Sequence, residues 1–292
     1  MATLRDIKRR IKGVQSTQQI TKAMKMVAAA KLRRAQENVI NARPYARKIY
    51  EILSHLITEE DILTNPFIVQ REINNVAIVV ITADRGLCGA FNTNLIKESV
   101  SYIKEELNNS TPHIYCVGKK GNDFFKKNDF EIFGQKVGLF ANVEFENALE
   151  ISKELINSYL KGVYDKVVII YNEFKSIIQQ KIVIEQFLPI PLNENMEKEE
   201  KKIFTNYIFE PDQSSIFKSM LPKHLVAQVW RILLETNAAF LGAQMTAMDN
   251  ATTNATELIR TLNLKYNRER QAAITKEILE IVSGANALKE NG

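Results

Sequence analysis

Cysteine and histidine are scarce in this sequence. Its 292 residues include two cysteines, Cys88 and Cys116, and three histidines. The cysteines do not form a CxxC pair, and the histidines stand far apart, without the spacing of metal ligands. The sequence therefore argues against thiol or metal catalysis and favours a reducing compartment in which both thiols are structural.

Long apolar runs are also missing. No stretch reaches the length of about eighteen apolar residues that a transmembrane helix needs, so no membrane span is predicted. The N-terminus lacks the apolar core of a signal peptide. It is basic, as in an organelle transit peptide, but its apolar pattern continues unbroken into the following segment. We therefore interpret it as mature structure, and a helix that starts directly after Met1 favours a bacterial origin.

The N-terminal segment, residues 1–58, carries a heptad pattern. Apolar residues recur in alternating steps of three and four from Leu4 to Leu56. This spacing keeps one side of a helix turned toward a partner helix, as in a coiled coil. A helix of roughly 55 residues would reach about 80 Å, which is longer than one compact domain requires. Pro44 is expected to kink or interrupt it.

Part of this helical seam is polar or small, at Gln18, Thr21, Lys25 and Ala28. Two interpretations remain open at this point. Polar seam residues can fix the register of a coiled coil. Alternatively, this stretch faces something other than a tightly packed helix.

Positive charge crowds the same segment. The formal net charge of the chain is +5, and Asp6 is the one acidic residue before Glu37. Such a stripe favours an acidic partner, which could be nucleic acid, anionic lipid or a protein surface. No aromatic residue is interleaved before Tyr45, and the apolar seam is too narrow for a membrane-surface helix. An acidic protein surface therefore fits best.

The segment 73–210 follows a different pattern. Apolar, β-rich runs alternate with helical ones, which predicts a Rossmann-like α/β domain with a largely parallel sheet. The expected strands are Val76–Thr82, His113–Val117, Lys166–Tyr171, Ile182–Phe187 and Ile203–Phe209. The expected helices are Asn94–Leu107, Lys119–Lys127 and Glu144–Leu160. A charged, solvated loop is expected at Asn193–Lys202.

The C-terminal segment, residues 212–289, again shows helical periodicity, with Pro222 expected in the first turn of its main run. Its middle, Asn237–Thr256, is rich in Ala, Thr, Asn and Gly. The two terminal helices are predicted to pair as a long antiparallel coiled coil with the α/β domain inserted between them. The alternative, a parallel homodimer through each helix, would crowd the inserted domains.

The most enzyme-like stretch is TADRGLCGAFNTN, which follows an expected strand and opens a helix. Phosphates bind at such places in α/β proteins. However, the stretch lacks both GxGxxG and the lysine of a P-loop. Gly86 and Gly89 are therefore expected to shape a tight turn, and Asp84 and Arg85 to form an ion pair or a partner contact. Near the other end of the chain, NRERQ (267–271) is either a solvated helix face or a grip on a partner's loop.

Three segments in the right order resemble the γ subunit of F-type rotary ATP synthases. They are Ile7–Arg34 (IKRRIKGVQSTQQITKAMKMVAAAKLRR), the central ITADRGLCGAFN, and Ile274–Ala287 (ITKEILEIVSGANA). Together they span almost the whole chain. The central segment alone is the least specific of the three.

The resemblance implies a central shaft without an active site, cofactor or nucleic-acid partner. One copy per complex would stand inside a ring of α and β subunits and contact δ, ε and the c ring. It would lie peripherally on the cytoplasmic face of a bacterial inner membrane and couple proton-driven rotation of the c ring to the β catalytic sites. The alternatives from other classes are an α/β enzyme with a coiled-coil dimerisation arm and a nucleic-acid-binding coiled-coil protein.

The resemblance also implies which residues contact a β subunit. Arg270 and Gln271 would meet its catch loop, with Thr275 and Glu280 further along the same helix. Met24 and Lys25 would lie near an acidic lever segment of β.

Overall fold

The computed structural model describes residues 4–57, 59–107, 110–191, 210 and 212–290. The chain divides into two compact units. Unit 1 comprises residues 1–27 and 245–292, and unit 2 comprises residues 28–244. Two long helices, α1 (Leu4–Leu56) and α7 (Gln213–Glu290), contribute to both units.

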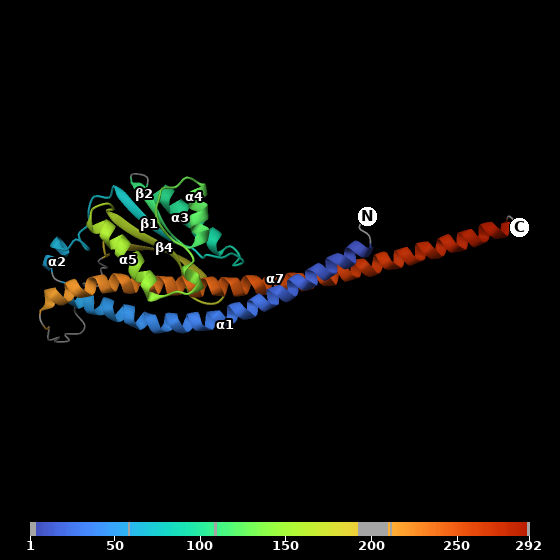
Figure 1. Ribbon diagram of the computed structural model, residues 1–292, viewed down its shortest axis with the longest axis horizontal. Coiled ribbons are helices and arrows are strands. Elements are labelled where there is room, and N and C mark those ends of the chain that lie inside the picture. The colour runs from blue at the N-terminus through green and yellow to red at the C-terminus, as the bar shows by residue number, and fades with distance from the viewer. Residues whose placement is uncertain (1–3, 58, 108–109, 192–209, 211, 291–292) are drawn as a thin grey trace. The chain divides into compact units, whose positions relative to one another are not determined.

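Unit 2 contains a five-stranded sheet with the order β3-β2-β1-β4-β5 (Figure 1). Its strands are β1 (Asn75–Ile81), β2 (Thr111–Val117), β3 (Ile132–Lys136), β4 (Lys166–Phe174) and β5 (Gln180–Leu188). The first four run parallel, and β5 is antiparallel to β4. In register, Ile78 of β1 lies between Ile114 and Val168. The predicted α/β architecture with a largely parallel sheet is confirmed.

One detail of the strand prediction differs from the structure, and two expected segments lie where the structure does not test them. Strand β3 was not expected, because its sequence IFGQK is short and its residues are half-buried or exposed, so it carries no continuous apolar run. The expected strand at Ile203–Phe209 and the charged loop at Asn193–Lys202 lie outside the described residues.

The remaining helices lie before and between the strands. They are α2 (Glu59–Thr64), α3 (Phe91–Glu106), α4 (Lys119–Lys127) and α5 (Phe145–Leu160), with a 3-10 turn η1 at Leu139–Ala141. The central strand β1 alternates its side chains between two apolar clusters. Ile78 packs in the cluster that contains Leu95 of α3 and Phe125 of α4. Val79 packs in the cluster that contains α5 and parts of α1 and α7. The sheet is therefore covered on both faces, as parallel sheets require.

Helix α1 runs through Pro44 without a break, so Pro44 does not interrupt it, and the alternative expectation of a kink stays a prediction. Proline removes one backbone hydrogen bond and costs about 3 kcal/mol inside a helix. Here Val39 and Ile49, on either side of Pro44 in sequence, are buried. Their packing offsets that cost and keeps the helix continuous.

The C-terminal helix starts close to residue 212, as predicted, but Pro222 does not lie in its first turn as expected. The helix begins at Gln213 and contains Pro222 in its interior. Asp212 precedes the first turn, and its Oδ1 accepts a 2.8 Å hydrogen bond from the Ser215 backbone N–H. Its Oδ2 accepts a second from the Ser215 hydroxyl, at 2.7 Å. This cap satisfies an otherwise unpaired N–H group and fixes the earlier start.

In unit 1, α1 and α7 pair in antiparallel fashion. Thr21 shares a 2.8 Å hydrogen bond with Thr252, and Lys25 donates one of 2.6 Å to Asp249. Gln18 donates to Thr256 at 2.7 Å. The residue numbers of the α7 partners decrease as those of the α1 residues increase, so the two helices run antiparallel. The polar seam residues thus pair across the two helices, as register-fixing residues would.

None of the described helices is both long and apolar enough to cross a membrane.

His224 of α7 is a buried imidazole inside unit 2, with 9% of its surface exposed. Its ring packs against Tyr50 of α1, with ring centroids 5.8 Å apart. Its Nδ1 has no hydrogen-bond partner among the described residues. Burial, together with the positive charge of Arg231, lowers the pKa of His224 to about 4, while Glu185 opposes the shift. His224 is therefore neutral at physiological pH.

We predict that His224 makes the stability of the chain sensitive to acid. Unfolding returns its pKa to an ordinary value of 6.5, so the unfolded state binds the proton first as the pH falls. Above pH 6.5 His224 is neutral in both states and does not lower the free energy of unfolding. As the pH falls from 6.5 to about 4, that free energy should decrease by about 3 kcal/mol. The free energy of unfolding of His224→Gln, measured in urea across this range, should fall less steeply than that of the wild type. Equal slopes would exclude His224 as the titrating group.

Candidate functional site

Asp84 ties three loops together at the carboxyl edge of the sheet. It follows β1, and its Oδ1 accepts hydrogen bonds from the backbone N–H of Lys119 at 3.0 Å and of Gly138 at 2.8 Å. Its Oδ2 accepts a third from the Phe140 N–H at 3.0 Å. Lys119 follows β2, and Gly138 and Phe140 follow β3. One carboxylate thus joins the loops after three neighbouring strands.

Asn92, a buried residue of α3, holds the loop between β1 and α3 in place. Its Oδ1 accepts from the Ala83 N–H at 2.9 Å, and its Nδ2 donates to the Arg85 carbonyl at 3.3 Å. Gly89 adopts a left-handed φ of 61°, which a glycine accommodates without strain. Leu87 also adopts a positive φ, of 63°, which the sequence did not indicate. The expected tight turn is therefore present at Gly89.

This arrangement explains why the loop is a poor phosphate site. The backbone N–H of Lys119 is the first of α4, and helix N-termini with free N–H groups attract anions. Asp84 already occupies that N–H and two more from neighbouring loops. A Cβ at Gly118 would also stand 2.0 Å from the Thr82 carbonyl oxygen, so the adjoining loop is closely packed. The expected Asp84–Arg85 ion pair is not among the ion pairs of the described residues.

The chemistry of the thiols is suppressed by burial. Cys88 and Cys116 are both free and buried. Burial raises the pKa of Cys88 and raises that of Cys116 to about 12. Both are thus held as thiols, the unreactive form. Within the described part of the chain, no three His, Cys, Asp or Glu residues gather in a way that could hold a metal ion.

The six residues expected to contact a β subunit all belong to unit 1. Met24 and Lys25 are half-buried on α1, and Lys25 pairs with Asp249. The other four, Arg270, Gln271, Thr275 and Glu280, are exposed on α7. Thr275 donates to the Gln271 carbonyl at 2.9 Å, and Glu280 lies 3.6 Å from Lys276. The structure therefore leaves the α7 set available to a partner.

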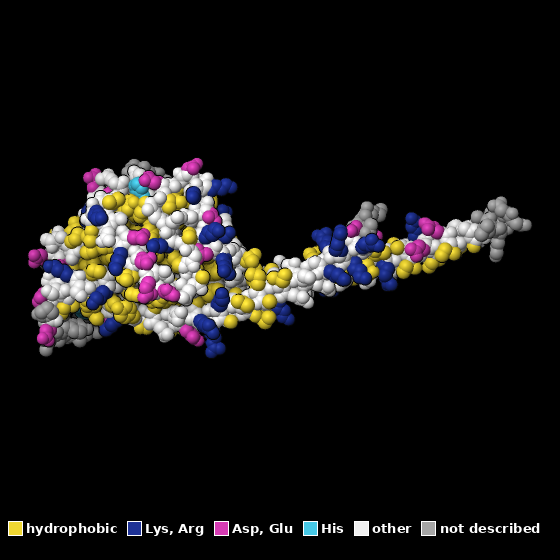
Figure 2. Space-filling view, viewed as in Figure 1, with side chains coloured by type: hydrophobic (Ala, Val, Ile, Leu, Met, Phe, Trp, Pro, Cys, Tyr) yellow, Lys and Arg dark blue, Asp and Glu magenta, His cyan; other side chains and the backbone are white. Residues whose placement is uncertain are grey.

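Basic side chains gather on unit 1 along the N-terminal part of α1 (Figure 2). Ile7 and Ile11 are buried there against Leu262, while the charged residues between and beside them are exposed. The exposed basic residues at this end of α1 are Arg5, Lys8, Arg9, Arg10 and Lys12. The charge stripe expected from the sequence thus lies on the surface of the helix pair.

Sequence reasoning missed a cavity of about 920 Å³ in unit 2. It opens between α1, α7 and β5, and its polar walls include Arg43, Glu185, His224, Arg231 and Glu235. These residues are far apart in the sequence and belong to no contiguous motif. Only the folded arrangement of the three elements brings them together.

Comparison with known proteins identifies the family. A family model described as ATP synthase matches residues 3–288. An ATP synthase gamma chain of Chlorobium phaeobacteroides is 51% identical over 294 residues, covering 99% of this chain and 100% of the relative. The gamma chain of Chloroherpeton thalassium is 48% identical over 303 residues, with 100% of both chains covered.

Solved structures show the same fold. A chain of the central stalk and c ring of the Tetrahymena thermophila mitochondrial ATP synthase has a TM-score of 0.62 and 26% identity. The match covers 80% of this chain and 99% of that one. A chain of the Euglena gracilis mitochondrial ATP synthase has a TM-score of 0.66 at 23% identity, covering 98% of this chain and 94% of that one, which supports the fold.

The protein is thus of the class in which two terminal helices pair in antiparallel fashion and carry an inserted α/β domain. The chain belongs to the γ-chain family of ATP synthases. It is a non-catalytic subunit with the role of a rotor in ATP synthesis. The resemblance seen in the sequence is confirmed.

We predict that Asp84→Asn destabilises the inserted domain. The amide keeps the size of the side chain but replaces one acceptor oxygen with a donor that faces a backbone N–H. Losing charge-assisted bonds and leaving an N–H unpaired should cost about 2–4 kcal/mol. Urea unfolding of the full chain measures this loss. Asp123→Asn, an exposed carboxylate on α4, is the control, and equal midpoints for the two variants would contradict the tying role.

Proposed function

We propose that this rotor couples rotation of a c ring to the β catalytic sites from inside a ring of alternating α and β subunits. One copy would serve each complex, because a single shaft in a three-fold ring makes the three sites unequal. A shaft that contacts each β state differently biases the equilibrium of each site in turn. Hydrogen ion transport through the membrane would supply the rotation.

The observation that carries this proposal is an exposed apolar stripe on α7. Leu264, Ile274, Ile278 and Ile281 are exposed at 65%, 44%, 53% and 71%. They lie beyond Leu262, which packs with Ile7 and Ile11 of α1. A lone helix cannot bury such a stripe on itself, and exposed apolar surface of this kind marks an interaction site. A surrounding ring would cover it.

The contacts between α1 and α7 in unit 1 suit a shaft that must turn against its surroundings. They combine small residues with single hydrogen bonds, such as that between Thr21 and Thr252. Lys25 takes part in that pairing through Asp249, whereas Arg5, Lys8, Arg10 and Lys12 are exposed at the N-terminal end of α1 and would face acidic loops. Diffuse charge attracts a partner without the deep apolar anchoring that would stop rotation.

Within this scheme we assign the β contacts as the family resemblance implies. Arg270 and Gln271 would hold a catch loop through directed hydrogen bonds. Met24 and Lys25 would face an acidic lever segment, and Lys25 could exchange Asp249 for a carboxylate of β. Thr275 and Glu280 would extend the contact along α7.

The other partners would be the α, δ and ε subunits and the c ring. Each of three segments would have its own role. The helices at 1–58 and 212–289 would form the shaft, and the domain at 73–210 would dock on ε and the membrane ring. In this scheme the chain would lie peripherally on the cytoplasmic face of a bacterial inner membrane. No nucleic acid is needed for any of these contacts.

The enzyme alternative has little support. The loop most similar to a phosphate site is filled by Asp84, and both thiols are held protonated. The nucleic-acid alternative rests on the basic stripe alone. An acidic protein surface explains that stripe better, because no aromatic residue is interleaved with it before Tyr45.

Reconstitution tests the proposal. The isolated chain should show no ATPase activity, and it should increase the ATP hydrolysis of a mixture of α and β subunits when added to it. Robust catalysis by the chain alone would refute the rotor role, and salt-sensitive DNA binding near physiological salt would favour the nucleic-acid alternative.

We predict that Arg270→Ala combined with Gln271→Ala leaves assembly intact and lowers coupled turnover. Losing charged and amide hydrogen bonds of about 1.5–3 kcal/mol should reduce ATP-driven proton pumping about tenfold or more. The pair Arg260→Ala with Asn263→Ala, also exposed on α7, removes the same kinds of group and is the control. Undiminished pumping by the first pair would count against the proposed grip.

A further inference from the structure

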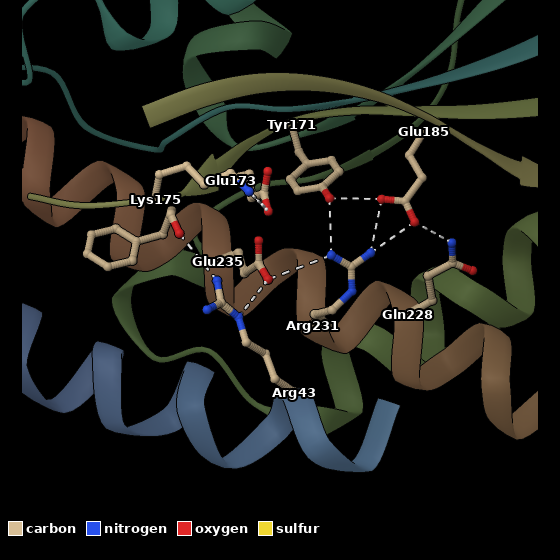
Figure 3. A network of polar contacts seen from close by, with 9 residues as sticks. Arg43, Tyr171, Glu173, Lys175, Glu185, Gln228, Arg231 and Glu235 are labelled. Carbon is tan, nitrogen blue, oxygen red and sulfur yellow. Dashed lines mark hydrogen bonds and ion pairs between the residues drawn. The ribbon is translucent and has the colours of Figure 1, made fainter. Parts of the chain in front are cut away.

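We propose that a polar network in unit 2 is a torsional joint, which locks the α/β domain to both long helices so that they turn as one body. This inference rests on the proposed rotor function. We call the network the Arg231 joint (Figure 3). Its members come from α1, β4, β5 and α7, and they are Arg43, Tyr171, Glu185, Gln228, Arg231 and Glu235.

The first half of the joint connects α7 with the sheet. Arg231 Nη2 donates to both carboxylate oxygens of Glu185, at 2.9 and 3.0 Å. Its Nη1 donates to the Tyr171 hydroxyl at 3.1 Å. That hydroxyl donates in turn to Glu185 at 2.8 Å. Gln228, nearly one turn earlier on α7, adds a 2.7 Å hydrogen bond to the same carboxylate. Figure 3 shows these side chains extending toward one another from the helix and the strands.

The second half brings in α1. Arg43 Nε donates to Glu235 at 3.3 Å, and Arg43 Nη2 donates to the Phe174 backbone carbonyl at 3.2 Å. Glu235 Oε1 also lies 3.7 Å from Arg231 Nη1. A single residue of α1 thus contacts both α7 and the end of β4. The two halves meet at Glu235 and Arg231, one turn apart on α7.

Most of the joint is buried, apart from Arg43, whose side chain is 46% exposed. The Glu235 side chain is 3% exposed and Tyr171 is 2% exposed, while Arg231 and Glu185 side chains are 21% and 26% exposed. Burial by itself would raise the pKa of Glu185, but Arg231, Gln228 and Tyr171 together lower it below its ordinary value. The carboxylate is thus held ionised beside the guanidinium. Removing one partner of such a pair leaves a buried charge uncompensated.

Apolar packing alone cannot supply this function. The cluster that joins α1 and α7 to the sheet holds the elements together, but the hydrophobic effect behind it is non-directional. Charge-assisted hydrogen bonds impose both distance and direction. The joint attaches at β5, the edge strand of the sheet, which is bonded directly to α7 through Glu185. A turning force on the domain would therefore reach α7 and α1 through this network.

The test separates torsional coupling from simple stability. It uses the complete ATP synthase complex carrying the full-length chain, in which ATP hydrolysis and ATP-driven proton pumping are measured together. Arg231→Met and Glu185→Gln each break the joint. We expect pumping per ATP hydrolysed to fall about fivefold, because the surviving charge is left unpaired and the joint opens. Lys48→Met, which removes an exposed pair with Glu51 on α1, is the control and should change neither activity.

The double variant Glu185→Leu with Arg231→Met discriminates further. Replacing a whole buried ion pair by apolar residues often restores stability, so the amount of assembled complex should recover. It does not restore directed contacts, so pumping per ATP should stay low. Recovery of pumping together with assembly would show that the network only stabilises the fold and would overturn the joint.

A milder variant keeps the proposal testable if both changes block assembly. Tyr171→Phe retains both charges and removes one donor and one acceptor. It should lower pumping per ATP measurably while hydrolysis is retained, and an unchanged ratio would refute the joint. Failure of the rotor function itself is distinguishable, because the wild-type chain would then not support pumping in the complex at all.

Discussion

Antiparallel pairing of the two ends of the chain is the constraint on which the rest of the structure depends. Once α1 leaves and α7 returns along it, the intervening residues must form a domain that begins and ends beside the same helix pair. The cluster formed by Ile49, Leu53, Leu225 and Ile232 with the sheet fulfils this condition. The parallel sheet then presents one face to the long helices and the other to α3 and α4.

The same two helices are held differently in the two units. In unit 2 they share a large apolar cluster with the sheet and are joined to it by charged hydrogen bonds. In unit 1 they meet through small side chains, single polar pairs and the short apolar contact of Ile7, Ile11 and Leu262. Strong, directed contacts suit a part that must transmit force. Sparse contacts with exposed charge suit a part that must turn against a partner.

Much of the fold could be predicted from one-dimensional patterns. The heptad steps of α1, the apolar runs of β1 and β4, and the helix from 119 to 127 all depend on local periodicity, which survives in any tertiary context. At Pro44 and Pro222 local propensity was outweighed. Packing keeps α1 continuous through Pro44, and the Asp212 cap starts α7 before Pro222, which therefore lies in the helix interior. Strand β3 was missed because a short strand with few buried residues lacks the apolar signal on which the prediction rests.

The candidate sites divide in the same way. The motif around Asp84 could be recognised in the sequence, but the role of the Asp84 carboxylate could not. The backbone N–H groups that it binds, of Lys119, Gly138 and Phe140, belong to loops that only the folded sheet brings together. The contacts assigned to Met24, Lys25, Arg270, Gln271, Thr275 and Glu280 remain predictions, because a partner must be present to test them.

By itself, the sequence determined the family, the parallel α/β domain and the pairing of the terminal helices, because each is written in contiguous motifs or in local periodicity. Three contacts were decided by the tertiary structure alone. Lys25 pairs with Asp249, and the Asp84 carboxylate binds the N–H groups that an anion would otherwise need. Arg231 of α7 bonds to Tyr171 of β4 and Glu185 of β5. These contacts link residues far apart in the chain. Their formation depends on distances and directions that no local pattern of side chains encodes.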